Sequence, residues 1–192
     1  LKARALYGSQ HRMIVQCNGL LPGGKPTSSG VHSTCGGGVN FVSQDNPIRL
    51  YVSHLFDADD EYQRVFEYLE SARNFFYRNL GAPDRPPKSR EKEALKEELR
   101  RQMADAEIVI LLARQFVRDP VLTEFQALYA KACDKPLLVV EPFGATEPVP
   151  ARLLELADEV APWNERSLSD AIRRQARHEE TTRWDVIEFK LD

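Results

Sequence analysis

The strongest constraint on the fold of this chain lies in residues 106–140, where two apolar runs flank a segment with helical spacing. The runs are Glu107 to Leu112 and Pro136 to Val140, and both are almost continuously apolar. Strands of that kind are buried on both sides, as in parallel sheets that are covered by helices. The helix between them opens at Asp119-Pro120, because aspartate suits the cap and proline the first helical position. These residues therefore predict a β-α-β unit.

The chain from residue 47 onwards repeats this alternation of strands and helices. Five strands in such an order predict a flavodoxin-like, doubly wound α/β fold, with a parallel five-stranded sheet of order 2-1-3-4-5 and helices on both faces. Further strands are predicted at residues 48–53, 74–78 and 159–161, and further helices at residues 59–72, 89–103, 151–156 and 167–177, the last capped by Ser167 or Ser169.

Ligands of such sheets collect at the carboxyl ends of the strands. We therefore expect the loop from Ala113 to Pro120 and the first turns of the next helix to face the site, and these turns carry Glu124. Helical spacing in this helix predicts a buried face made of Val121, Phe125, Leu128 and Ala132.

Composition excludes several classes of function. A net charge of −3 gives no general attraction to nucleic acid or to an anionic membrane. No apolar run approaches the roughly 18 residues that a membrane span needs. The three scattered cysteines, Cys17, Cys35 and Cys133, indicate a reducing compartment. We therefore expect a cytoplasmic protein with no nucleic-acid or membrane partner.

The two ends of the chain differ from its middle. Residues 1–46 hold eight of the ten glycines and lack hydrophobic periodicity, which predicts a disordered or loosely attached arm. Its start at Leu1, with the first methionine at Met13, leaves open whether the arm is native. The run GLLPGGK in the arm resembles half of a phosphate loop, but Pro26 follows it where serine or threonine is required. Residues 179–192 form an extension whose strand-like part is expected either to add an edge strand or to pack over the sheet.

An acidic group, Asp57, Asp59, Asp60 and Glu61, crowds the start of the helix at residues 59–72. We interpret it as capping and as a favourable interaction with the helix dipole, so no metal site is predicted. Two classes with the same topology fit poorly. A receiver domain needs an aspartate at the end of the third strand, where Ala113 and Arg114 stand. A flavodoxin needs a loop rich in serine, threonine and glycine after the first strand to hold phosphate, whereas the acidic run HLFDADD stands there.

Three stretches resemble a known family: YVSHLFDADD, IVILLARQFVRDPVLTEFQALYAKACDKP and PARLLELADEVAPWNERSLSDAIR. They look like the TIR-like domain known as MTH538 or DUF1863, which includes the TIR subunit of the Thoeris anti-phage system. The resemblance covers about Pro47 to Arg177 and so implies a TIR-like domain at residues 47–178. It implies cleavage of NAD, as substrate rather than cofactor, at the nicotinamide-ribosyl bond. The products would be those of hydrolysis or of cyclisation to an ADP-ribose-type signal, in antiviral defence or signalling.

The same resemblance implies site residues. The family's catalytic glutamate ends a pattern of tryptophan, a small or apolar residue, two variable positions and glutamate, which falls here on Pro120 to Glu124. Glu124 matches, and Pro120 replaces the tryptophan. A carboxylate there would stabilise the oxocarbenium-like charge that develops on the ribose. By the same resemblance, Ser53, His54 and Phe56 would line the nucleotide pocket. Asp57 and Arg114 are further candidates for substrate binding, and Arg114 could meet a phosphate. The family also implies self-association through TIR-type contacts. The alternative is a non-catalytic TIR-like module that binds nucleotide or partner domains.

Overall fold

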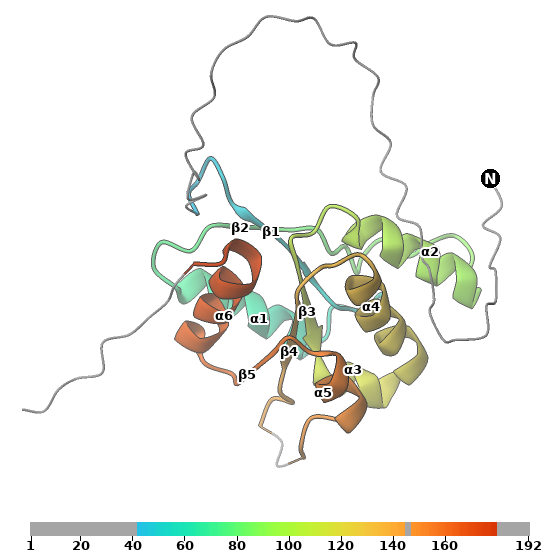
Figure 1. Cartoon of the computed structure of the whole chain (residues 1–192). Coiled ribbons are helices and arrows are strands. Elements are labelled where there is room, and N and C mark those ends of the chain that lie inside the picture. Colours follow the sequence, from blue (N-terminus) through green and yellow to red (C-terminus); the bar gives the residue numbers. More distant parts are fainter. Residues whose placement is uncertain (1–41, 145–146, 180–192) are drawn as a thin grey trace, which may run out of the picture. The chain divides into compact units, whose positions relative to one another are not determined.

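The computed structural model describes residues 42–144 and 147–179, in which strands and helices alternate (Figure 1). The strands are β1 (Ile48–Val52), β2 (Tyr77–Asn79), β3 (Ile108–Leu112), β4 (Leu137–Val140) and β5 (Glu159–Ala161). The helices are α1 (Asp60–Ser71), α2 (Lys92–Met103), α3 (Ala113–Arg118), α4 (Pro120–Ala132), α5 (Ala151–Leu156) and α6 (Glu165–Arg177).

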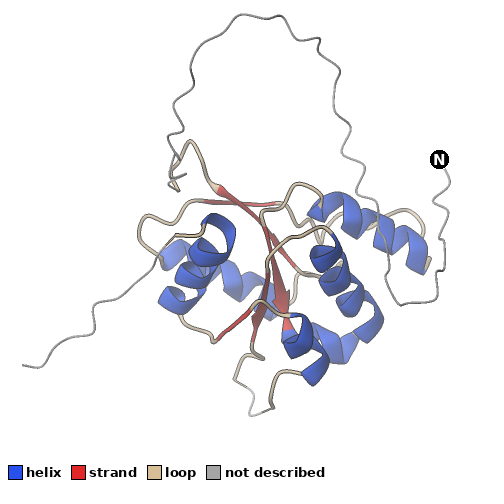
Figure 2. Cartoon of the chain, in the orientation of Figure 1, coloured by secondary structure: helices blue, strands red, loops and turns tan. Residues whose placement is uncertain are grey.

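The strands form one sheet of order β2-β1-β3-β4-β5 in which every neighbouring pair is parallel. Figure 2 shows this sheet between helices on its two sides. In the register of the sheet, Leu50 of β1 lies opposite Ile108 of β3, and Val109 lies opposite Leu137 of β4. The fold, the strand order and the parallel pairing predicted from the sequence are therefore confirmed.

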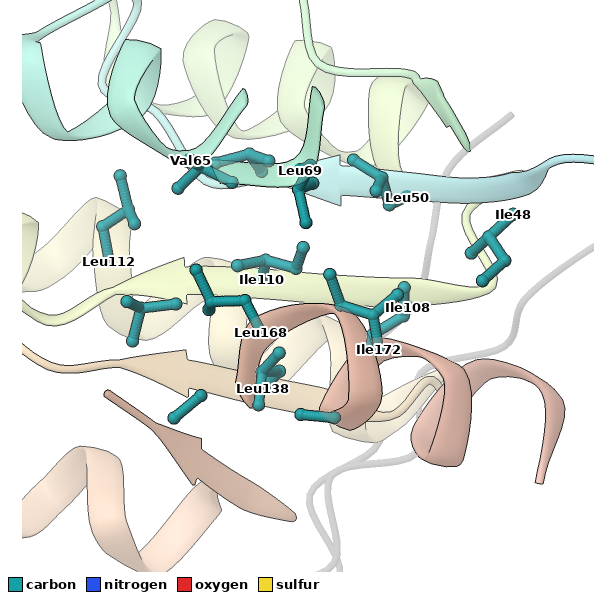
Figure 3. Packing of buried hydrophobic residues seen from close by; sticks show 14 of the residues in the cluster. Ile48, Leu50, Val65, Leu69, Ile108, Ile110, Leu112, Leu138, Leu168 and Ile172 are labelled. Carbon is teal, nitrogen blue, oxygen red and sulfur yellow. The ribbon is translucent and has the colours of Figure 1, made fainter. Parts of the chain in front are cut away.

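Two hydrophobic cores lie on opposite faces of the sheet, and β3 contributes to both. Ile110 and Leu112 belong to the core that α1 and α6 cover, whereas Val109 and Leu111 belong to the core under α2, α4 and α5. Figure 3 shows the first core, with Val65 of α1 facing the sheet. All five side chains of β3 are fully buried. Burial of one such side chain stabilises the fold by about 1.5–3 kcal/mol, which explains the continuous apolar run.

Aspartates begin two of the helices, as the sequence predicts. Asp59 Oδ1 accepts a hydrogen bond from Tyr62 N at 2.8 Å at the start of α1. Asp119 Oδ1 accepts one from Leu122 N at 3.0 Å at the start of α4, where Pro120 is the first helical residue. Each cap satisfies a backbone N–H group that has no partner within its own helix.

Some local predictions are wrong. Residues 113–118 form the short helix α3 rather than a loop. The second strand is Tyr77–Asn79 rather than residues 74–78. Helix α6 begins at Glu165, because Asn164 and not a serine supplies its cap and accepts from Ser167 N at 3.0 Å.

The buried face of α4 also differs from the prediction. Val121, Leu128 and Ala132 are exposed and Phe125 is half-buried. The residues that α4 buries are Leu122, Thr123, Gln126, Ala127 and Ala130. The buried face includes the Gln126 amide, which has hydrogen-bond partners inside the protein. Spacing based on apolar residues alone therefore selects the wrong stripe.

The predictions for the ends of the chain fall mostly outside the described residues. This holds for the arm up to residue 41 and for the edge strand predicted at residues 184–191. Residues 42–46 are described and include a turn in which Ser43 and Asn46 exchange backbone hydrogen bonds. Within residues 42–144 and 147–179, no helix combines the length and the apolar character that crossing a membrane requires.

Candidate functional site

The carboxyl ends of β1, β3 and β4 lie side by side, because these strands are adjacent and parallel. The segments that follow them are residues 53–59, 113–119 and 141–144. Ligands of doubly wound sheets bind at this edge, which makes it the candidate site. Five of the six predicted site residues lie in these segments: Ser53, His54, Phe56, Asp57 and Arg114.

Ser53 lies at the end of β1 and is fully buried. Its Oγ donates to Gln115 Oε1 at 2.8 Å and accepts from Leu112 N at 3.0 Å. Gln115 Nε2 donates back to the Ser53 carbonyl at 3.0 Å. The hydroxyl therefore joins the ends of β1 and β3 to α3, and its hydrogen bonds are made within the protein rather than towards a ligand.

His54 is also fully buried, and its hydrogen bonds define its tautomer. Phe56 N donates to Nδ1 at 3.2 Å, so Nδ1 carries no proton. Nε2 then carries the proton and donates to Gln102 Oε1 at 2.8 Å. Desolvation lowers the pKa of this imidazole, although the Gln102 hydrogen bond and the carboxylates of Glu98 and Asp84 act in the opposite direction. His54 is a neutral structural residue at the end of β1.

Three buried glutamines hold this end of β1, and the sequence predictions did not identify them. Gln115 contacts Ser53 and Gln102 contacts His54, as described above. Gln126 Oε1 accepts from the Tyr51 hydroxyl at 2.8 Å, and Gln126 Nε2 donates to the His54 carbonyl at 3.3 Å. Their only signal in the sequence is a polar residue within an otherwise apolar helical stripe, and such a residue also occurs on exposed faces.

Phe56 and Asp57 continue the segment after β1. Phe56 has a φ of 59°, a left-handed conformation in which its N–H reaches the His54 ring. Asp57 is exposed and pairs with Arg118 of α3 at 3.0 Å. Arg118 also pairs with the capping residue Asp59 at 2.7 Å. The two aspartates are therefore engaged by one arginine.

Arg114, at the start of α3, meets a carboxylate that the predictions treated as part of a cap. Its Nε lies 3.1 Å from Glu61 Oε1, and its Nη2 donates to the Phe143 carbonyl at 3.2 Å. Phe143 N donates to the same Glu61 oxygen at 2.8 Å. Desolvation raises the pKa of the Glu61 carboxyl, and the Phe143 N–H and Arg114 offset only part of this rise. Glu61 Oε2 is buried and has no hydrogen-bond partner among the described residues.

Glu124 lies apart from the residues at the end of β1. Its Oε1 accepts from Arg152 Nε of α5 at 2.6 Å, and its side chain is 34% exposed. Gln126, which reaches Tyr51 and His54, lies two positions further along α4, about 200° around the helix at roughly 100° per residue. Within the described ranges, no hydrogen bond or ion pair joins Glu124 to the predicted substrate-binding residues. The structure therefore places Ser53 to Asp57 and Arg114 at the ends of β1 and β3, and Glu124 on the α5 side of α4.

Neither a scan against models of protein families nor a search of curated proteins gives a match for this chain. The fold defines a flavodoxin-like α/β protein, and the TIR-like assignment stays a prediction. In the part of the chain that the structure describes, no group of three or more histidine, cysteine, aspartate or glutamate side chains is arranged to hold a metal ion.

Proposed function

We propose that this chain is a TIR-like enzyme that cleaves NAD⁺ at the bond between nicotinamide and ribose, by hydrolysis or by cyclisation, in antiviral defence or signalling. The observation that supports this most directly is the position of Glu124. It lies in the second turn of α4. The central strand β3 is followed by α3, and α4 begins two residues after the end of α3. A half-buried carboxylate therefore lies early in the helix that leads away from the carboxyl edge of the sheet, and ligands of this fold bind at that edge.

The chemistry needs a carboxylate for a definite reason. As nicotinamide leaves, its bond to C1′ of the ribose breaks and positive charge develops on the sugar, as in glycoside hydrolysis. A fixed negative charge near the ring stabilises that charge more in the transition state than in the ground state. Water or the adenine of the same substrate then attacks C1′, which gives hydrolysis or cyclisation.

The Glu124–Arg152 pair favours a second candidate function. A guanidinium 2.6 Å from the carboxylate oxygen counters the charge that would stabilise a ribosyl cation. Pro120 also occupies the position where the family has tryptophan. Both observations support a non-catalytic TIR-like module that binds nucleotide or partner domains without turnover.

Nicotinamide release by the purified full chain separates these two functions. We expect Glu124→Gln to reduce release about 100-fold or more, the size of effect seen when an electrostatic stabiliser is removed. Glu155→Gln is the matched control, because Glu155 pairs with the same Arg152 at 2.9 Å and is more exposed. It should retain activity. Equal release from wild type and Glu124→Gln would remove Glu124 from the mechanism, and nucleotide binding without any release would favour the binding module.

Self-association is part of the proposed function. Val121 and Leu128 are exposed on α4 at three and four residues from Glu124, so all three lie on one face of the helix. A second copy that covered this face would exclude water from Glu124 and strengthen its electrostatic effect. Nicotinamide release should therefore rise more steeply than in proportion to protein concentration, in step with assembly measured by sedimentation. Release per molecule that is independent of concentration would argue against this role for assembly.

A further inference from the structure

Glu61, Arg114 and Phe143 form a closed set of contacts at the carboxyl edge of the sheet. One carboxylate oxygen, Glu61 Oε1, faces Arg114 Nε at 3.1 Å and accepts from Phe143 N at 2.8 Å. Arg114 Nη2 donates to the Phe143 carbonyl at 3.2 Å and closes the set. Glu61 follows β1, Arg114 follows β3 and Phe143 follows β4, so the segments after three adjacent strands meet here. The guanidinium is therefore fixed on two sides.

The same contacts leave part of Arg114 available. The Glu61 side chain is 6% exposed, whereas that of Arg114 is 53% exposed. Arg114 Nη1 has no hydrogen-bond partner among the described residues. Its N–H groups and the second N–H of Nη2 form a planar fork of donors. Such a fork matches two oxygens of a phosphate group. Arg64 supplies a second guanidinium, whose Cζ lies 4.0 Å from the centroid of the Phe143 ring.

We propose that Arg114 binds the diphosphate of a nucleotide at this edge, that Arg64 adds to the positive charge, and that Glu61 is a positioning residue that holds the Arg114 fork towards the ligand. This role rests on the proposed function, because it identifies which part of NAD⁺ this edge of the sheet recognises. Two aspartates of the nearby acidic group, Asp57 and Asp59, are paired with Arg118 rather than with Arg114.

The positioning role and a purely electrostatic role of Glu61 predict opposite results. A negative charge near the site repels a phosphate, so simple electrostatics predicts that its removal tightens binding. Positioning predicts weaker binding, because a freed arginine must lose side-chain freedom each time the ligand binds. The titratable and charged groups that act on Glu61 are Arg114, Asp59 and Arg64.

Calorimetric titration of the full chain with ADP-ribose and with adenosine tests the site, because only ADP-ribose carries a diphosphate. We expect Arg114→Gln to weaken ADP-ribose binding about 10-fold or more and to leave adenosine binding unchanged. Arg114→Lys, which keeps the charge and loses the fork, should weaken it less. The matched control is Arg101→Gln, because the Arg101 side chain is 72% exposed and pairs with Glu98 of α2 rather than with a residue of this site. Its affinity should stay within about twofold of wild type.

Glu61→Gln keeps an oxygen for Phe143 N and removes the charge. We expect it to weaken ADP-ribose binding about 2- to 10-fold, and tighter binding would overturn the positioning role. The affinity for ADP-ribose is also measured as a function of pH, over a range in which the diphosphate stays ionised. The affinity of wild type should fall as pH drops below the raised pKa of Glu61. This fall should be absent from Glu61→Gln. A shared pH profile would also overturn the role.

Inorganic pyrophosphate distinguishes failure of this site from failure of the proposed function. If wild type binds ADP-ribose and Arg114→Gln binds it equally well, the phosphate site is wrong while the nucleotide proposal stands. If wild type ignores ADP-ribose but binds pyrophosphate through Arg114, the phosphate site stands and the nucleotide proposal fails. If wild type binds neither, the phosphate site is overturned.

Discussion

Replacement of Ser53 by alanine tests whether this residue contacts substrate or holds the sheet together. The hydroxyl is fully buried and has two partners, Leu112 N at 3.0 Å and Gln115 Oε1 at 2.8 Å. Alanine removes the hydroxyl and changes little else in shape. It leaves one backbone N–H and one amide oxygen buried without those partners. The resemblance to the TIR-like family implies a role in binding, whereas these contacts imply a role in stability.

The size of the effect follows from the two groups that lose a partner. An unpaired buried neutral group costs about 1–3 kcal/mol, so we expect Ser53→Ala to lower the free energy of unfolding by about 2–4 kcal/mol. Gln115 Nε2 keeps its bond to the Ser53 carbonyl, which places the effect in this range rather than above it. Because a domain of this size is stable by about 5–15 kcal/mol, the variant should still fold.

Urea unfolding followed by far-ultraviolet circular dichroism measures this change. The slope of the free energy with urea should stay constant and the midpoint should fall. Ser71→Ala is the control, because its exposed hydroxyl donates to the Tyr68 carbonyl at 2.9 Å and should matter by less than about 0.5 kcal/mol. A Ser53→Ala variant as stable as wild type, with weaker nucleotide binding, would show that the hydroxyl serves the ligand and that the structural reasoning is wrong.

Three further outcomes are expected in urea unfolding. Because the pKa of His54 is lowered in the folded state, the unfolded state binds the proton first as pH falls. The stability that neutral His54 contributes is therefore present above about pH 6.5 and is lost below it. His54→Gln should flatten this loss of stability between pH 7 and 5.5. Because the pKa of Glu61 is raised in the folded state, its ionisation costs stability as pH rises past about 4.5. The free energy of unfolding of Glu61→Gln should therefore rise relative to that of wild type between pH 5 and 7.5. A difference in free energy that does not change with pH would contradict the raised pKa. Arg177→Met should cost about 2–3 kcal/mol, because Arg177 Nη2 contacts Glu107 at 3.2 Å and the Pro47 carbonyl at 3.3 Å, while Arg166→Met on the exposed side of α6 serves as control.

The sheet could be predicted from the sequence because its information is local. Each residue of β3 is apolar, and a five-residue apolar run can satisfy its burial only between two layers of helices. The consecutive residues Asp119 and Pro120 mark the start of α4. The parallel order then follows from the alternation of strands and helices. Such signals need no knowledge of what lies on the other side of the core.

The buried polar contacts could not be predicted in this way, because their partners are distant in the sequence. Gln126 lies 75 residues from Tyr51, and Phe143 lies 82 residues from Glu61. A glutamine in a helix has the same local pattern whether it faces water or a buried hydroxyl. Whether the glutamine is buried depends on the element that packs against the helix. The face that α4 buries was therefore predicted wrongly.

Glu61 and Glu124 show what this means for function. In the sequence analysis, Glu61 belongs to the acidic group at the start of a helix, and the resemblance to the TIR-like family makes Glu124 the carboxylate of the site. In the structure both face an arginine Nε, at 3.1 Å and 2.6 Å, but Glu61 is 6% exposed and Glu124 is 34% exposed. A charge interaction grows as solvent is excluded, so of these two carboxylates Glu61 acts more strongly on its arginine. Glu124 gains comparable influence only when its exposed side is covered. The pH dependence of ligand binding should therefore report Glu61, and the dependence on protein concentration should report Glu124.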